Sequence, residues 1–142
     1  MIASAGGYPK DINVYQAQKA LDNAYQAVKS GGTIILLAEC LEGYGEPTFK
    51  KWIEEANSPD DIIKRLNKRF ILGDHKAYSI AKLAKEVEVI LISSLPSEKI
   101  RKLFFIPMEN IYQALNYVKG KYGEDFQAYI LSSGNTVLPQ LI

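Results

Sequence analysis

Hydrophobic residues follow two alternating patterns along this chain: short unbroken runs, and longer stretches in which they recur every three or four positions. Unbroken runs occupy Thr33–Ala38 and Val89–Ile92, and such runs are typical of strands that are covered on both faces. The spacing of three to four is clearest from Val14 to Val28, where it predicts a helix with one apolar face. The alternation of the two patterns therefore predicts an α/β domain with a mostly parallel sheet.

Most of the predicted helices and strands begin or end at a residue type that favours such a boundary. Pro47, Ser58 and Asp74 suit the first turn of a helix, and Gly123 suits a helix end. Pro107 closes the fourth strand, because proline cannot donate to a ladder. The predicted strands are Ile2–Ala5, Thr33–Ala38, Val89–Ile92, Phe104–Ile106 and Phe126–Leu131, and helices begin near Val14, Pro47, Ser58, Asp74, Pro96 and Ile111.

The order of these elements predicts one three-layer domain over residues 1–142, with about five strands and with helices on both faces of the sheet. This is a Rossmann-like architecture. Gly6 and Gly7 do not form the G-x-G-x-x-G fingerprint of dinucleotide binding. No repeat, linker or low-complexity segment interrupts the chain, so we expect a single unit without a dinucleotide site.

Composition narrows the possible functions. The net charge of +1 gives no electrostatic case for nucleic acid, and no apolar run approaches the roughly 20 residues that span a bilayer. No secretory signal is recognisable, and the lone Cys40 fits a reducing compartment. The lone His75 leaves no cluster for a metal site. We expect a cytoplasmic domain that binds no nucleic acid, no membrane and no metal of its own.

Candidate chemistry gathers where the first strand passes into the first helix. Gly6 and Gly7 let a ligand approach the main chain closely, because glycine adopts backbone conformations closed to other residues. Either Asp11 or Asn13 can cap the helix with a side-chain oxygen. A helix start favours an anion through its dipole and its unpaired N–H groups, so we expect an anion to bind near this turn.

Three polar side chains follow on this helix. Tyr15 and Lys19 are four residues apart and share a neighbouring face, with Gln16 beside them. A lysine, a phenol and an amide near a helix start make a site for a small carboxylate or a phosphate. A structural interpretation is equally open: Gln16 completes a capping box with Asn13, Tyr15 is half-buried core, and Lys19 is a solvated surface residue.

The carboxyl ends of parallel strands meet at one edge of a sheet, where ligands gather in folds of this class. The helix that opens with His75 and Lys76 precedes a strand, so its start should lie at this edge, near Lys19. His75 is then either a surface residue or a donor to a bound anion at neutral pH. We expect Gly6, Lys19, His75 and Ser132 to border one cleft. The loops expected at this edge are Gly6–Gly7, Glu39, Ser93–Ser94 and Ser132–Gly134.

Five runs of the sequence form a recognisable set, at Ala3–Asn13, Tyr15–Lys19, Gly32–Gly43, Gly73–Lys76 and Gly134–Pro139. Through these runs the chain resembles the C-terminal domain of the nickel-dependent lactate racemase family. The resemblance covers nearly the whole chain, but only the second half of such an enzyme. It implies a domain that closes over the substrate of a 2-hydroxy acid racemase or epimerase.

The resemblance also implies a division of tasks between two domains. The N-terminal domain, expected as the partner, holds a nickel pincer nucleotide and the catalytic residues, and the reaction resembles a hydride transfer. Here Tyr15, Gln16 and Lys19 match the substrate-facing residues, with Lys19 paired to the substrate carboxylate. His75 and Lys76 complete the expected set of substrate-binding residues. They stand where lactate racemase has a tryptophan, so the resemblance leaves two substrates open: lactate, or a larger or more polar hydroxy acid. This chain supplies no catalytic residue and is expected to be inactive alone.

Two other functions stay open. A stand-alone α/β module could bind a phosphate or another small anion at the loop from Gly6 to Lys19, without chemistry. A structural domain could instead contribute only to an oligomer. A preceding domain with paired histidines and a cofactor-type lysine would favour the racemase.

Overall fold

A single parallel sheet forms the centre of the molecule. The computed structural model describes residues 1–68 and 74–140. Within these ranges five strands pair in the order β4-β3-β2-β1-β5, and every pairing is parallel. The predicted sheet is therefore confirmed. The strands are β1 (Ile2–Ser4), β2 (Thr33–Leu37), β3 (Glu88–Ile92), β4 (Ile106–Met108) and β5 (Ile130–Leu131).

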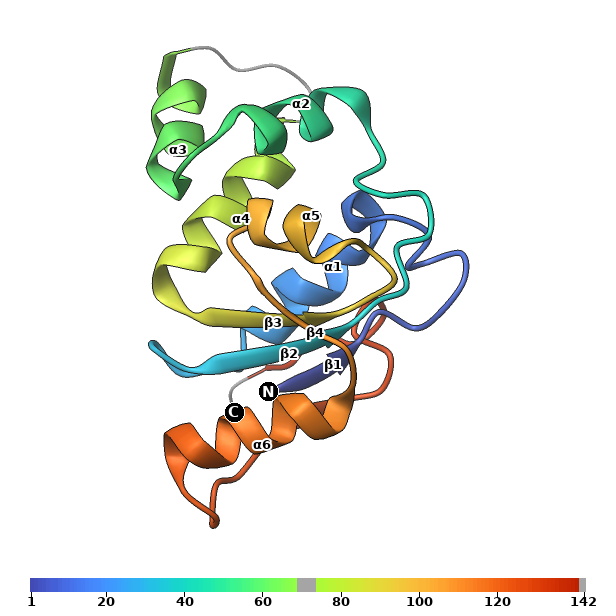
Figure 1. Cartoon of the computed structure of the whole chain (residues 1–142), viewed down its shortest axis with the longest axis vertical. Helices are drawn as coiled ribbons and strands as arrows, with labels where there is room; N and C mark the ends of the chain where they lie inside the picture. The colour runs from blue at the N-terminus through green and yellow to red at the C-terminus, as the bar shows by residue number, and fades with distance from the viewer. Residues whose placement is uncertain (69–73, 141–142) are drawn as a thin grey trace.

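Helices lie on both faces of this sheet, so the three predicted layers are also confirmed. Helices α1 to α5 lie above the sheet in Figure 1 and α6 lies below it. None of the helices in the described ranges has the length and hydrophobicity of a membrane span. The helices are α1 (Val14–Tyr25), α2 (Pro47–Glu55), α3 (Pro59–Lys68), α4 (Asp74–Glu86), α5 (Ser97–Lys102) and α6 (Ile111–Tyr122).

Strand register sorts the side chains between two cores. Neighbouring residues of a strand point to opposite faces, so Ile34 packs into the core under α1 to α5 while Ile35 packs toward α6. The register places one isoleucine from each strand in a single row that crosses the whole sheet. That row is Ile106, Ile90, Ile35, Ile2 and Ile130.

Strands β1, β2 and β3 each differ from prediction by one residue at one end, whereas the predicted bounds of the last two strands are wrong by more. The fourth strand begins at Ile106 and includes Pro107, which pairs in register with Leu91. Proline is tolerated there because β4 is an edge strand, whose outer side needs no ladder donor. The last strand is only Ile130–Leu131, and Phe126, the predicted first residue of this strand, instead packs against the core beside α6.

One helix boundary also differs from prediction. Helix α1 ends at Tyr25 and not at Val28, because residues 26–28 continue as tighter turns. Helix α3 begins at Pro59, directly after the predicted start at Ser58, and is described as far as Lys68. Gly73 lies outside the described residues.

Candidate functional site

The loop after β2 closes the start of α1. Asn13, and not Asp11, is the cap: its Oδ1 accepts from the N–H of Gln16 at 2.9 Å. The N–H of Val14 donates to the carbonyl of Gly43, and the N–H of Tyr15 donates to the carbonyl of Tyr44, both at 3.0 Å. The expectation that free N–H groups of this turn bind an anion is therefore wrong. An anion here must be held by side chains.

A glycine lets that loop approach the cap. A Cβ on Gly45 would lie 2.6 Å from Cγ of Asn13, and Gly45 has φ +93°, a conformation that side chains rarely adopt. Asp11 has a different task from capping: it is buried, and its carboxylate accepts from the N–H of Glu39 at 3.1 Å. The loops that follow β1 and β2 are thus bound to each other.

The candidate side chains of α1 differ in exposure. Tyr15 is half-buried, with its ring edge-on to Phe49 at 5.7 Å between centroids. Gln16 and Lys19 are exposed. Tyr15 therefore packs against the core and Lys19 faces outward, as the structural interpretation expects, while a binding role for these side chains stays a prediction.

Helix α4 runs beside α1 in the same direction. Contacts between them follow the same order along both helices: Lys76 with Tyr15, Ser79 with Asp22, and Glu86 with Tyr25. Because α1 starts at the carboxyl edge of the sheet, the first turn of α4 lies at that edge too. The structure thus brings together Lys76 and Tyr15, with exposed His75 in the same turn of α4.

Lys76 brings an ammonium group from α4 to Tyr15, four residues before Lys19 on α1. The Nζ of Lys76 donates to the carbonyl of Tyr15 at 2.5 Å and lies 3.9 Å from the centre of its ring. Burial lowers the pKa of Lys76; the positive charge of Lys19 lowers it further, while Asp22 opposes both. Asp22 is itself engaged by Gln18 at 2.5 Å and by Ser79 at 2.7 Å. The cluster therefore carries an excess of positive charge.

The other residues predicted at this edge hold the loops together. Ser93 Oγ donates to the carbonyl of Glu39 at 2.9 Å, and Ser94 Oγ bonds the Glu39 carboxylate. Burial, the largest influence, raises the pKa of Cys40 to about 12, so this thiol is not a reactive thiolate. These side chains connect the loops at the carboxyl edge of the sheet and add no positive charge to the cluster of Lys19 and Lys76.

Sequence reasoning missed Lys10 and Asn135. The Lys10 side chain lies over Gly6, with its Cδ 3.3 Å from the position that a Cβ there would take. Asn135 is buried and donates to the carbonyl of Lys10 at 3.1 Å, which ties the last loop to the glycine loop. Both residues stand within the runs that carry the family resemblance, and that position was the available signal.

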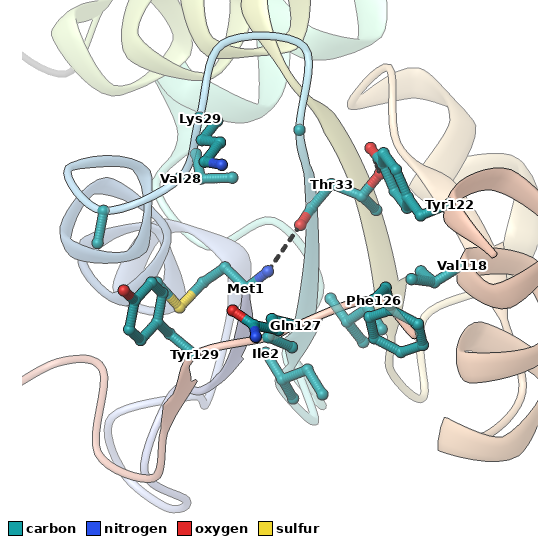
Figure 2. Close-up of a pocket in the computed structure, with 14 residues that line it drawn as sticks. Met1, Ile2, Val28, Lys29, Thr33, Val118, Tyr122, Phe126, Gln127 and Tyr129 are labelled. Carbon is teal, nitrogen blue, oxygen red and sulfur yellow. Dashed lines mark hydrogen bonds between the residues drawn. The ribbon is translucent and has the colours of Figure 1, made fainter. Parts of the chain in front are cut away.

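A cavity of about 320 Å³ lies at the opposite, amino edge of the sheet (Figure 2). Met1 and Thr33 form its wall on the strands, and Tyr122 and Phe126 form its wall on the other side. This cavity is remote from the start of α1. The cleft expected between Gly6, Lys19, His75 and Ser132 stays a prediction.

Metal-binding side chains do not gather in the described residues. Across residues 1–68 and 74–140, no three or more His, Cys, Asp or Glu side chains are placed to hold one metal ion. The donor set of these ranges does not fit a nickel centre. No step of the function proposed below runs through a metal held by this chain.

Comparison with known proteins decides the family. Residues 1–138 match the model of the lactate racemase C-terminal domain. The chain belongs to the lactate racemase C-terminal domain family. Within it, the chain is 28% identical over 143 residues to the lactate racemase of Thermoanaerobacterium thermosaccharolyticum, covering 97% of this chain and 34% of that protein. It is 33% identical over 98 residues to the lactate racemase of Lactiplantibacillus plantarum, covering 66% of this chain and 23% of that protein.

Solved structures agree with this family. The lactate racemase apoprotein of T. thermosaccharolyticum superposes with a TM-score of 0.88 at 29% identity, covering 96% of this chain and 34% of that one. A Thermotoga maritima protein superposes with a TM-score of 0.61 at 20% identity, covering 96% and 36%, which shows the shared fold alone. This racemase C-terminal domain thus spans about a third of the length of the T. thermosaccharolyticum racemase that it matches.

Proposed function

We propose that this chain is the substrate-binding domain of a racemase or epimerase that acts on 2-hydroxy acids, and that Lys19 binds the substrate carboxylate. The family and the similar lactate racemases support the reaction class. The cationic group at the start of α1 supports the position. The observation that carries the proposal is the position of exposed Lys19 one turn into α1, four residues after Tyr15, whose carbonyl and ring are contacted by Lys76 of α4.

Two neighbouring ammonium groups repel each other, and the start of a helix adds further positive potential. The first turn of α1, which is fully described, contains no acidic residue. A carboxylate bound by exposed Lys19 would relieve this repulsion. Because the backbone N–H groups of the turn are already occupied, the side chain of Lys19 is the available charged donor.

Tyr15 and Gln16 would orient the bound acid. The phenol of Tyr15 and the amide of Gln16 both offer hydrogen-bond donors, and both residues precede Lys19 within one turn of α1. Exposed His75 would contribute a further donor from the first turn of α4. Gly6 and Gly7, exposed and with φ of +95° and +74°, would leave room for the substrate beside the main chain.

The rest of the reaction belongs to the remaining part of such an enzyme. We propose as partner an N-terminal domain that holds a nickel pincer nucleotide and the catalytic residues, because the similar racemases are about three times as long as this chain. The present chain would position the hydroxy acid and help to exclude water when the two domains close. Alone it should racemise no hydroxy acid.

Replacement of Lys19 tests the proposal. In the complete racemase that contains this domain, Lys19→Ala should lower kcat/KM by about 30- to 1000-fold, since a charge-assisted bond to a desolvated carboxylate is lost. Circular dichroism should show an unchanged fold. Lys82→Ala, an exposed lysine on α4, is the matched control and should stay within about twofold of the parent. If Lys19→Ala behaves like this control, Lys19 is a solvated surface residue.

Lys19→Ala also distinguishes the proposed function from the alternative, a stand-alone module that binds small anions. A stand-alone module for small anions would use the same lysines, but it would not distinguish a 2-hydroxy acid from inorganic phosphate. Binding of phosphate by the chain, with no response to a 2-hydroxy acid and with dependence on Lys19, would favour that module.

A further inference from the structure

We propose that Lys76 is a positioning residue that orients Tyr15, and that it does not bind the substrate itself. This differs from the substrate-binding role expected for it from the sequence. The proposal rests on the proposed function only for the nature of the bound acid. The contact between Lys76 and Tyr15 stands on the geometry alone.

A single ammonium group makes two contacts with one residue. The Nζ of Lys76 donates to the carbonyl of Tyr15 at 2.5 Å, and the same atom lies over the aromatic ring at 3.9 Å from its centre. The electron-rich face of a phenol attracts a cation at this distance. The carbonyl takes one of the three donors of this ammonium group and the ring covers another side of it, which leaves less of Lys76 available to a substrate carboxylate.

These contacts form at a site where a positive charge is disfavoured. Lys76 is half-buried, and burial together with the charge of Lys19 lowers its pKa. Among the described residues, Asp22 opposes these effects, and that carboxylate is shared with Gln18 and Ser79. The charged form of Lys76 is therefore held beside α1 in spite of the cost of its desolvation, which points to a specific role.

That task is to restrain Tyr15 from the side of α4. Phe49, from α2, meets the Tyr15 ring edge-on at an interplanar angle of 71°, while Lys76 covers a ring face. The ring is thereby restrained by two different helices. The direction of its hydroxyl is set by these two contacts, and Gln16 and Lys19 keep their places relative to it because they lie on the same helix.

Nuclear magnetic resonance of the 142-residue chain tests this inference. Lys76→Met removes the charge and keeps a linear side chain, and Lys76→Arg restores a cation that can donate and stack. Lys82→Met removes the same charge from an exposed site on α4 and is the matched control. The readouts are the ring-proton shifts of Tyr15, and the affinity for sodium lactate measured at Lys19, with sodium chloride as the salt control.

We expect Lys76→Met to move the Tyr15 ring resonances and to weaken lactate binding by about 3- to 10-fold, while the lactate-dependent shift at Lys19 persists. Lys76→Arg should restore most of the ring shifts and of the affinity. Lys82→Met should change neither. The amide spectrum of each variant shows whether the fold is intact, and Lys76→Arg keeps the test decisive if Lys76→Met unfolds.

Two results would overturn the proposal. Tyr15 ring resonances that are unmoved in folded Lys76→Met would show that Lys76 does not position this ring. Loss of lactate binding in folded Lys76→Met as complete as in Lys19→Ala would make Lys76 a direct ligand. A failure of the proposed function looks different: lactate would then cause no shift at Lys19 in the parent chain, while the ring readout still decides the role of Lys76.

Discussion

On one face of the sheet, α1, α2, α4 and α5 bury a broad core; on the other, α6 lies alone over a small one (Figure 1). The larger core includes fully buried Leu21, Phe49 and Ile53, and a second tier in which α3 packs on α4. In the described residues, the smaller core has four buried members, and its other members are only partly buried. The four are Ile35, Ile90, Ala114 and Val118.

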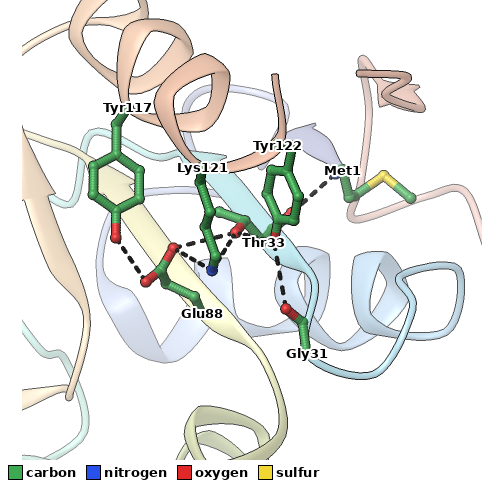
Figure 3. Close-up of polar contacts among 7 residues, drawn as sticks. All are labelled: Met1, Gly31, Thr33, Glu88, Tyr117, Lys121 and Tyr122. Carbon is green, nitrogen blue, oxygen red and sulfur yellow. Dashed lines mark hydrogen bonds and ion pairs between the residues drawn. The ribbon is translucent and has the colours of Figure 1, made fainter. Parts of the chain in front are cut away.

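Polar contacts supplement the thin core under α6 (Figure 3). Glu88, at the start of β3, accepts from Tyr117 at 2.9 Å and from Lys121 at 3.1 Å. Tyr122 bonds the hydroxyl of Thr33 at 2.9 Å and the carbonyl of Gly31 at 3.3 Å. We call these six residues the α6 clasp. The two faces of the sheet thus differ in how their helices are held. Apolar packing holds α1 to α5, whereas α6 is held by a small apolar core together with hydrogen bonds at the edge of the sheet.

This difference also bears on the candidate site. Lys19, Tyr15 and Lys76 belong to the thickly covered face, where Tyr15 contacts Phe49 in the core. A binding site must keep its side chains within a fraction of an ångström, and packed helices provide this more reliably than exposed contacts do. We therefore expect the site to persist under conditions in which α6 begins to open.

A matched pair on one strand should show the largest effect. Ile34 and Ile35 are neighbours in β2, both buried, and they face opposite cores. Ile34→Ala should cost about 4 kcal/mol of unfolding free energy and Ile35→Ala about 2–3 kcal/mol, since a cavity costs more where the surroundings cannot collapse. Urea unfolding measures both. Equal losses, or a larger loss at Ile35, would contradict the difference between the faces.

The clasp predicts a smaller and local effect. Glu88→Ala should cost about 1 kcal/mol, because the carboxylate loses its hydrogen bonds to Tyr117, Lys121 and Thr33 at a site that solvent partly screens. Hydrogen exchange should speed up in the amides of α6 and stay unchanged in α1. Glu124→Ala is the control, since that carboxylate meets Lys119 at 3.4 Å with its side chain 82% exposed. If α1 and α6 lose protection together, the two faces unfold as one unit.

Alkaline pH should produce the smallest effect. The hydrogen bond to Glu88 raises the pKa of Tyr117 from its usual 10.0. Burial disfavours the charge of Lys121, yet bonds to Glu88 and Tyr122 raise its pKa above the usual 10.5. In both cases the folded state holds its proton more tightly, so this stabilisation is complete below the unfolded pKa and is lost as pH rises through the folded one.

Protection of α6 should accordingly fall above about pH 10, and Glu88→Gln should weaken this dependence. Hydrogen exchange of α6 and α1 over an alkaline series gives the comparison. A pH dependence that is the same in the parent and in Glu88→Gln would remove the clasp as its cause.

Much of the fold was predictable from local patterns. Unbroken apolar runs identified β2 and β3, and the spacing of three to four identified α1, because burial on one or both faces imposes these periods directly on the sequence. The shared edge of α1 and α4 followed from parallel topology alone. Boundaries were less predictable: Pro107 is in a strand because β4 lies at an edge, and edge position is a property of the assembled sheet.

Within the candidate site, the sequence by itself determined which residue types stand at the start of α1 and that Lys76 would come near them. Tertiary structure decided what those groups do. The N–H groups of Val14 and Tyr15 bond a loop about thirty residues away, and the ammonium of Lys76 is held by Tyr15. Such bonds depend on how distant segments are brought together and leave no periodic trace in either segment. The residues near the candidate site could therefore be predicted from sequence, whereas their partners required the structure.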